Sequence, residues 1–222
     1  FDGWLETLLQ SRFPAHELVI RNLGFSGDEL TLRLRSEGFG SPDDHLSTHK
    51  ADVVFAFFGF NESFAGPQGL EKFKKDLEAT AQGMLGKQYN GKSPPRIVLF
   101  SPIAQEDLKD PNFSDGVENN KNIGLYAEAM AEVAKKLGVP FVDLFTASRE
   151  LYAGAPRPLT INGIHLTERG NELLARAIDG ALFPDEPGAK REPQALEKLR
   201  SAVLDKCFYW YQRYRVVDGY NV

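Results

Sequence analysis

The chain has 222 residues, and its content of 42% hydrophobic and 26% charged residues excludes a largely disordered polypeptide. Its 26 Lys and Arg against 31 Asp and Glu give a net charge of −5, which argues against a broad basic surface for nucleic acid. No run approaches ~18 apolar residues, so no membrane span is predicted. The single cysteine, Cys207, excludes an internal disulfide and a cysteine-rich metal site.

Apolar patterns predict helices and strands that alternate along the chain. Short apolar runs are typical of strands in a parallel sheet, and the longest run suits a strand buried on both faces. Apolar residues at spacings of three and four are typical of helices with one buried side. In chain order, the patterns predict a helix over residues 4–13, strands over 17–22 and 52–58, a helix over 70–84, a strand over 96–100, a helix over 123–137, a strand over 139–144 and a helix over 173–182.

This alternation predicts a doubly wound α/β fold with a parallel sheet between two helical layers. Functional side chains in such sheets lie beyond the carboxyl ends of the strands. The segments just after Asn22, Phe58, Phe100 and Leu144 are therefore the first places to look for a site.

The composition changes near residue 184 and predicts a domain boundary there. Residues 184–188 (Pro-Asp-Glu-Pro-Gly) read as a linker, so residues 1–183 are predicted to form the main domain. Residues 184–222 are predicted to be this linker followed by a C-terminal helical extension. The aromatic residues at 208–214 are expected to pack that extension onto the body of the protein or onto a neighbouring domain.

Three strand exits carry unusual residues. The chain reads Asn-Leu-Gly-Phe-Ser-Gly-Asp over residues 22–28, Gly-Phe-Asn-Glu over 59–62 and Asn-Gly-Ile-His over 162–165. Each of these alone is also typical of an ordinary turn, because Gly and Asn tolerate left-handed backbone conformations. Their order and their positions at strand ends are more specific than any one of them.

Taken together, these motifs resemble the SGNH hydrolase family, also called GDSL esterases/lipases, over roughly residues 3–183. Gly27 aligns with the family's glycine, Asn61 with its asparagine and His165 with its histidine. The resemblance implies a three-layer α/β/α sandwich with a flavodoxin-like parallel sheet. It also implies a serine esterase that hydrolyses a small acyl or acetyl ester, such as one on a carbohydrate, without a cofactor.

Ester hydrolysis explains why these residue types are needed. The reaction passes through a tetrahedral oxyanion, and the Gly27 backbone N–H and the Asn61 amide could donate hydrogen bonds to it. A histidine such as His165 must take the serine proton and return it to the leaving alcohol. A third group must hold that histidine in the productive tautomer.

The chain departs from the family pattern at the nucleophile. The family's Gly-Asp-Ser does not occur, and the resemblance implies that the serine lies upstream of Phe1 on a first strand. Ser26 and Ser63 fall in the site region but not at the nucleophile's position. The first strand belongs between the strands predicted at 17–22 and 52–58, so a gap in the sheet and a longer parent chain are expected.

The second departure is Asn162, which stands where the family has an aspartate. An amide is neutral and can select the other imidazole tautomer, and in a serine protease such a change costs about 10⁴-fold in rate. Two functions therefore stay open. The first is an esterase with a weakened triad, and the second is a catalytically silent module that binds a ligand such as a glycan or docks within a larger protein.

A narrower resemblance concerns the parent protein. Residues 12–14, 21–28 and 213–219, with the Ser101-Pro-Ile segment, resemble an SGNH-like module near the start of large exported bacterial proteins. This implies export, as to a periplasm, and further domains in the parent chain. Such proteins can carry cytochrome-c-like domains, but the haem motif Cys-x-x-Cys-His is absent here.

His45 and His49 have the spacing of two metal ligands on one helix face. The surrounding segment 41–49 reads as a turn, however, and no third ligand is indicated. The sequence therefore predicts no metal site.

Overall fold

A computed structural model describes residues 3–35, 37–185 and 192–215. At its centre lie three parallel strands in the order β1-β2-β3, namely Val53–Phe57, Arg96–Phe100 and Phe141–Val142. β1 pairs with β2 from Val53–Arg96 to Phe57–Phe100, and β3 pairs with the end of β2. The strands predicted at 52–58, 96–100 and 139–144 are therefore confirmed, the last of them shortened to two residues.

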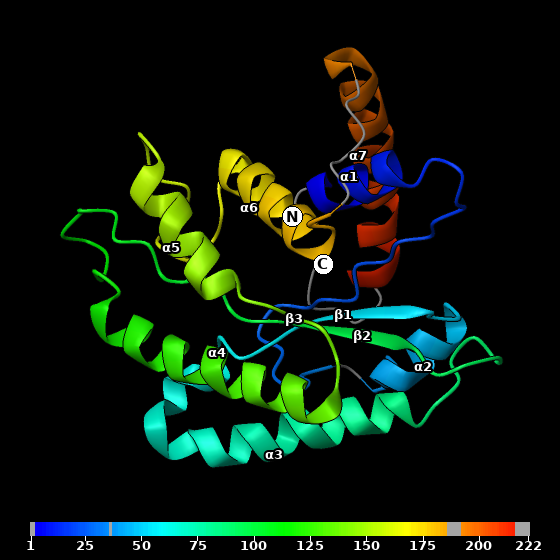
Figure 1. Cartoon of the computed structure of the whole chain (residues 1–222), viewed down its shortest axis with the longest axis horizontal. Helices are drawn as coiled ribbons and strands as arrows, with labels where there is room; N and C mark the ends of the chain where they lie inside the picture. Colours follow the sequence, from blue (N-terminus) through cyan, green and yellow to red (C-terminus); the bar gives the residue numbers. More distant parts are fainter. Residues whose placement is uncertain (1–2, 36, 186–191, 216–222) are drawn as a thin grey trace.

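Helices cover both faces of this sheet (Figure 1). On one face lie α3 (Gly66–Leu85) and α4 (Val117–Leu137), which pack on each other and on β2. On the other face lie α1 (Trp4–Arg12), α6 (Glu168–Leu182) and α7 (Pro193–Arg215), with α5 (Leu144–Gly154) beside α6. The predicted three-layer α/β/α sandwich is thus confirmed.

The apolar residues that predicted the helices are buried or half-buried in the structure. In α4, Tyr126, Met130 and Val133 are buried in the core between α3, α4 and the sheet, and Ile123 is also buried. The helix ends at Gly138, whose φ of 67° is the left-handed conformation that glycine adopts without strain. The four helices predicted in residues 4–182 are all present.

Two helices lie where the sequence analysis placed none. α2 (Pro42–Thr48) occupies the segment read as a turn, and it begins with a capping box between Ser41 and Asp44. α5 follows β3 without a turn, because the Asp143 side chain caps it by accepting a hydrogen bond from the Thr146 N–H.

The strand predicted at 17–22 is wrong, because these residues join no sheet. Side chains of α1 and α7 instead satisfy carbonyl groups of alternate residues. Gln10 donates to the Leu18 carbonyl at 2.9 Å, Lys206 to that of Ile20 at 3.1 Å and Trp210 to that of Asn22 at 2.8 Å. A strand needs a pairing partner, and the structure places none beside this segment among the described residues.

The outer edge of β1 is open. Among the described residues, no strand pairs with it, and Val53 and Phe57 are 41% and 38% exposed although the run is apolar. The expectation that this strand is buried on both faces is therefore wrong. Beside it lies a cleft of about 1800 Å³, called the β1 cleft here, which is lined by residues of β1, the segment 17–28, α1 and α7.

The C-terminal extension packs onto the body through its aromatic residues. Trp210 stacks on Tyr214, and Tyr214 donates to the Leu23 carbonyl at 3.0 Å. The predicted role of these two aromatic residues is confirmed. Residues 186–188 of the predicted linker lie outside the described residues. No helix in the described ranges has the length and apolar character needed to cross a membrane.

Candidate active site

His165 lies on a short loop between α5 and α6. Thr160 and Leu166 form an antiparallel bridge at the base of this loop, and the Ile161 N–H donates to the His165 carbonyl at 2.8 Å. Thr167 caps α6 directly after the loop by accepting a hydrogen bond from the Gly170 N–H. Within the connection 155–167, the histidine is therefore held on the part that the Thr160–Leu166 bridge closes.

The structure brings Asn162 and His165 together. The Asn162 Oδ1 lies 3.1 Å from the His165 Nδ1. The same oxygen accepts the backbone N–H groups of Ile164 at 3.3 Å and of His165 at 2.9 Å. Asn162 is half-buried and His165 is exposed, so the imidazole stays open to a substrate.

These backbone bonds fix which end of the Asn162 amide faces the ring. Two N–H groups point at Oδ1, and the amide nitrogen cannot accept from them. The atom beside Nδ1 is therefore an acceptor, and it selects the tautomer with hydrogen on Nδ1. In that tautomer Nε2 is the basic nitrogen, which is the arrangement that general-base catalysis requires.

Glu106, on the loop after β2, holds the base of the histidine loop. Its buried carboxylate accepts the N–H of Leu159 at 3.0 Å and the N–H and hydroxyl of Thr160 at 2.7 and 2.6 Å. Tyr152 lies nearby, where burial and the negative charge of Glu106 raise the pKa of its phenol. Its hydroxyl therefore stays protonated and donates to the Ala104 carbonyl at 3.2 Å.

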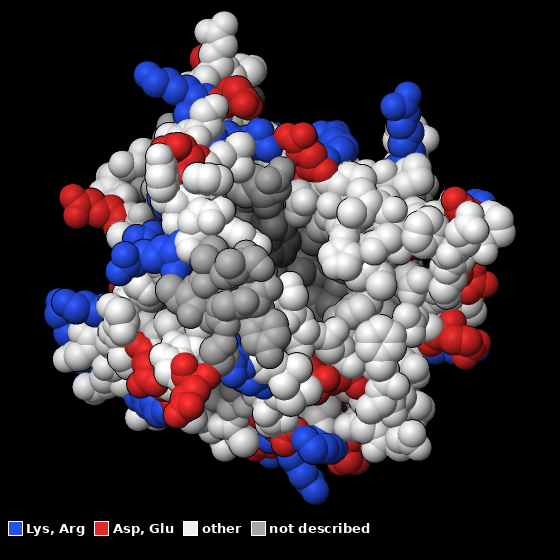
Figure 2. Space-filling view, turned by 180° about the vertical axis from the view of Figure 1, so that it is seen from behind, with Lys and Arg blue, Asp and Glu red and all other residues white. Residues whose placement is uncertain are grey.

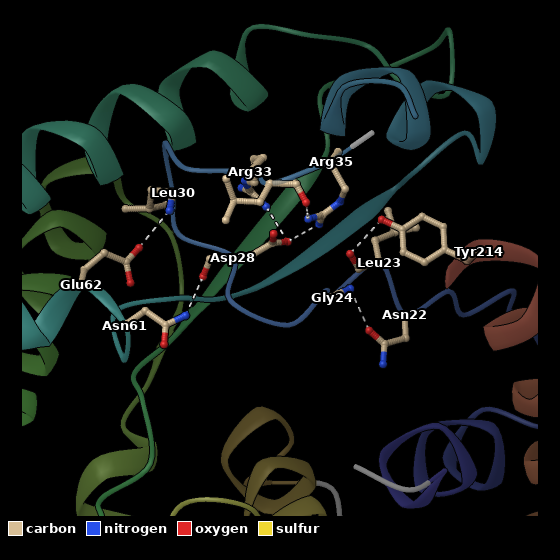
Figure 3. Close-up of polar contacts among 11 residues, drawn as sticks. Asn22, Leu23, Gly24, Asp28, Leu30, Arg33, Arg35, Asn61, Glu62 and Tyr214 are labelled. Atoms are coloured by element: carbon tan, nitrogen blue, oxygen red, sulfur yellow. Dashed lines mark hydrogen bonds and ion pairs between the residues drawn. The ribbon is translucent and has the colours of Figure 1, made fainter. Parts of the chain in front are cut away.

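Gly27 and Asn61 lie together at the rim of the β1 cleft. The Asn61 Nδ2 donates to the carbonyl of Asp28, the residue after Gly27, at 3.1 Å (Figure 3). Gly27 has a φ of 79°, and a side chain there would meet no atom within 4 Å. The glycine is therefore needed for its left-handed backbone and not to avoid a steric clash.

Charged side chains fix this second part of the site, and the sequence analysis gave them no role. Glu62 accepts the backbone N–H groups of Leu30 and Gly59, each at 2.9 Å. The Asp28 carboxylate pairs with Arg35 at 2.7 Å and with Arg33 at 3.2 Å (Figure 3). The signal that could have found them is the presence of charged residues within the motifs at 22–28 and 59–62.

Each pair is tied to a loop that follows one of two neighbouring strands. Asn61 follows β1, and Glu106, which holds the histidine loop, follows β2. Parallel strands end at the same edge of a sheet, so both pairs belong to that edge. Within the described part of the chain, no hydrogen bond joins Asn162 or His165 to Gly27 or Asn61.

The serines near the site do not contact His165. Ser63 is buried and donates to the Phe60 carbonyl at 2.6 Å, while Ser26 is exposed in the turn before Gly27. Ser101 is also buried, and its hydroxyl accepts the N–H groups of Leu144 and Phe145 at the start of α5. Their contacts are those of structural residues.

His45 lies on α2 and His49 caps its end, and both rings contact aromatic residues of α7. The His45 Nε2 lies 2.9 Å from the Phe39 carbonyl oxygen, and His49 packs edge-on against Trp210 with ring centroids 5.0 Å apart. Burial, together with the positive charge of Arg21, lowers the pKa of His49.

Comparison with known proteins gives a family match over most of the chain. The model of the GDSL-like Lipase/Acylhydrolase family matches residues 1–173. A curated relative, the GDSL esterase/lipase WDL1 of Oryza sativa subsp. japonica, is 26% identical over 170 residues. That match covers 71% of this chain and 57% of the relative, so the chain spans little more than half of that protein's length.

Solved structures share the fold at lower identity. Axe2, an acetylxylan esterase from Geobacillus stearothermophilus, superposes with a TM-score of 0.62 at 18% identity over 85% of this chain and 82% of its own. LAE5, an alpha/beta hydrolase enzyme from the metagenome of Lake Arreo, Spain, gives 0.61 at 21% identity over 82% and 81%. The aryl esterase of M. smegmatis gives 0.55 at 20% identity over 82% and 84%.

Proposed function

Because the chain belongs to the GDSL-like lipase/acylhydrolase family, we propose that it is the acid–base and oxyanion part of a serine esterase. The observation that carries the proposal is the contact of 3.1 Å between the Asn162 Oδ1 and the His165 Nδ1. This contact makes Nε2 the basic nitrogen of an exposed imidazole, on a loop that belongs to the carboxyl edge of the sheet.

The proposed reaction has two steps. A serine hydroxyl attacks the ester carbonyl carbon and passes its proton to the His165 Nε2, and the carbonyl π electrons move to the oxygen. The tetrahedral oxyanion then collapses, the bond to the alcohol breaks, and Nε2 returns the proton to the alcohol. Water removes the acyl group from the serine by the same proton transfers.

Gly27 and Asn61 are proposed to stabilise the oxyanion. The Asn61 amide nitrogen carries two hydrogens, and one of them is used by the Asp28 carbonyl at 3.1 Å. The second hydrogen and the backbone N–H of Gly27, which lines the β1 cleft together with Asn61, are the two proposed donors. Donors held in place before the reaction stabilise the charge without reorganising.

We propose that the nucleophile reaches the site on a strand in the β1 cleft. Among the described residues no strand pairs with the outer edge of β1, and a parallel strand there would cover Val53 and Phe57. Its carboxyl end would lie at the same edge of the sheet as Asn61. This strand, with its serine, is expected to precede Phe1 in the parent polypeptide.

The proposed substrate is a small acyl ester, such as an acetyl group on a carbohydrate. Support comes from Axe2, an acetylxylan esterase whose fold this chain shares. Figure 2 shows Lys and Arg interspersed with Asp and Glu on the face it displays, which offers no large surface of one charge for a polyanion.

Hydrolysis of p-nitrophenyl acetate by the parent protein tests the proposal. We expect His165→Ala to lower kcat/KM by at least about 10³-fold, because both proton transfers are lost. Lys136→Ala is the control and should leave the rate unchanged, since Lys136 forms an exposed ion pair with Glu78 at 2.7 Å in the last turn of α4, which leads to the amino end of β3. Equal rates for wild type and His165→Ala would contradict the proposal and favour the ligand-binding module.

A further inference from the structure

The loop that carries His165 is held to the body by one buried carboxylate. Glu106 is 6% exposed, and both of its carboxylate oxygens accept the Leu159 N–H at 3.0 Å. The Oε2 also accepts the Thr160 N–H at 2.7 Å and the Thr160 hydroxyl at 2.6 Å. These donors come from the residues that lead directly into the Asn162–His165 motif.

The backbone of Glu106 binds the same loop a second time. Its N–H donates to the Gly163 carbonyl at 2.8 Å, between Asn162 and His165. The Gly163 N–H in turn donates to the Thr160 hydroxyl oxygen at 3.0 Å. Side chain and backbone of Glu106 thus hold the loop at Leu159, Thr160 and Gly163.

Gly163 lets the two loops approach this closely. Its φ is 84°, and a Cβ there would lie 2.9 Å from the Glu106 carbonyl oxygen. A larger residue would push the loop away from Glu106 or strain its backbone.

A buried carboxylate is costly unless its oxygens are satisfied by donors. Leaving the donors of Leu159 and Thr160 unpaired in the interior is costly as well. Both costs are avoided only when the loop is docked on Glu106, because the donors and the carboxylate then satisfy each other. The carboxylate therefore acts as a restraint on the position of the loop and not simply as one more surface contact.

We propose that Glu106 is a positioning residue, which sets the place of the Asn162–His165 pair by docking its loop on the carboxyl end of β2. It touches neither the imidazole nor a reacting atom in this scheme. A shift of the imidazole by ~1 Å can cost about 10²-fold in rate. As a contribution to catalysis, this inference rests on the proposed esterase function.

The test uses nitrogen NMR of the imidazole rings in the parent protein labelled at histidine, with His165 assigned from the signals missing in His165→Ala. We expect Nδ1 of His165 to be protonated in the neutral wild-type ring. In Glu106→Gln, an amide replaces an acceptor oxygen beside donors, the loop loosens, and the His165 signals should move toward a mixture of tautomers. Thr160→Val removes the hydroxyl bonds alone and should move them in the same direction.

Asp179→Asn is the matched control. Asp179 forms a side-chain ion pair with Arg12 at 2.5 Å between α6 and α1, so its loss lowers stability without touching the histidine loop. Unchanged His165 signals in Glu106→Gln, or in Thr160→Val should the first variant not fold, would overturn the inference. So would equal changes in Asp179→Asn.

Kinetics separates this inference from the proposed function. In the parent protein, Glu106→Gln should lower kcat about 10- to 100-fold on p-nitrophenyl acetate while KM changes less than about threefold. Glu106→Asp, which keeps the charge, should recover part of that loss. If no protein hydrolyses esters, the proposed function fails, and the NMR signals still decide whether Glu106 positions the histidine.

Discussion

The two parts of the site are held in different ways. The histidine loop is fixed by a short bridge, by the amide of Asn162 and by the buried carboxylate of Glu106. The part around Gly27 has no regular secondary structure and borders the β1 cleft, where it depends on side-chain bonds from Asn61 and Glu62.

The proposed acid–base pair, Asn162 and His165, is therefore fixed in place, whereas the part of the site around Gly27 borders an open cleft. The β2–β3 side of the sheet is paired and covered, and β2 is buried along four of its five residues. On the β1 side, the described residues provide no further strand, and both ends of β1 are exposed. The histidine loop is thus anchored on the paired side of the sheet, and the proposed oxyanion donors lie on the side where we propose a further strand.

After that of His165→Ala, the largest effect is expected on the β1 side. Asn61→Ala should lower kcat by about 10² to 10³-fold with little change in KM, because a donor to the oxyanion is lost. Kinetics of the parent protein on p-nitrophenyl acetate measures this. Asn90→Ala is the control, since Asn90 donates to Asp52 at 2.7 Å before β2, at the opposite edge of the sheet. A similar loss in both variants would mean that Asn61 acts only through stability.

The next effect concerns the stability contributed by the histidine loop. Gly163→Ala should destabilise the protein by about 1–3 kcal/mol, because alanine is strained at a φ of 84° and its Cβ would crowd the Glu106 carbonyl. Unfolding in urea measures the change. Gly180→Ala in α6, where a Cβ would meet no atom within 4 Å, should instead be neutral or stabilising by up to ~1 kcal/mol. Equal behaviour of the two variants would contradict the close approach of the loops.

A smaller effect tests which imidazole tautomer Asn162 selects. Since its Oδ1 already selects the productive tautomer, Asn162→Asp adds only a charge that stabilises the imidazolium. We expect kcat/KM to rise about tenfold, the ratio that ~1.4 kcal/mol gives. A rise near 10⁴-fold would show instead that the asparagine holds the wrong tautomer.

The smallest effect concerns the packing of α7 beside the β1 cleft. Burial and the nearby charges of Arg21, His45 and Arg213 lower the pKa of His49 below its usual 6.5. The stability that comes from its neutral ring is fully present above pH 6.5 and is lost as the pH falls toward the lowered pKa. Urea unfolding at pH 7.5 and 5.5 should show a slightly larger loss for wild type than for His49→Phe. Identical losses would contradict the assigned burial.

Local patterns were enough to predict much of the fold. The apolar runs of β1 and β2 and the buried stripe of α4 each depend on neighbouring residues, so their spacing is visible in the sequence. α5 was missed although Asp143 is a capping residue, because β3 has only two residues and gives way to the helix without a turn. The segment 17–22 has a strand's composition, but whether it joins a sheet depends on a partner distant in the sequence.

The same distinction explains what could be predicted of the site. Asn162 and His165 lie three residues apart, and Asn61 directly follows an apolar run, so motif spacing located them. Glu106 could not be found in this way, because its partner Leu159 lies 53 residues further along the chain. The Asn162 amide orientation also needed the structure, since the backbone N–H groups that fix it come from the folded loop.

The proposal that His165 activates a serine on a strand in the β1 cleft is tested most directly by labelling the parent protein with a fluorophosphonate, which reacts with activated serines. The labelled peptide is then mapped. We predict one labelled serine, on a segment outside these 222 residues, and loss of the label in His165→Ala. A label on Ser26, Ser63 or another serine of this chain would contradict the proposed strand in the β1 cleft. Labelling that persists in His165→Ala would contradict the role of the histidine.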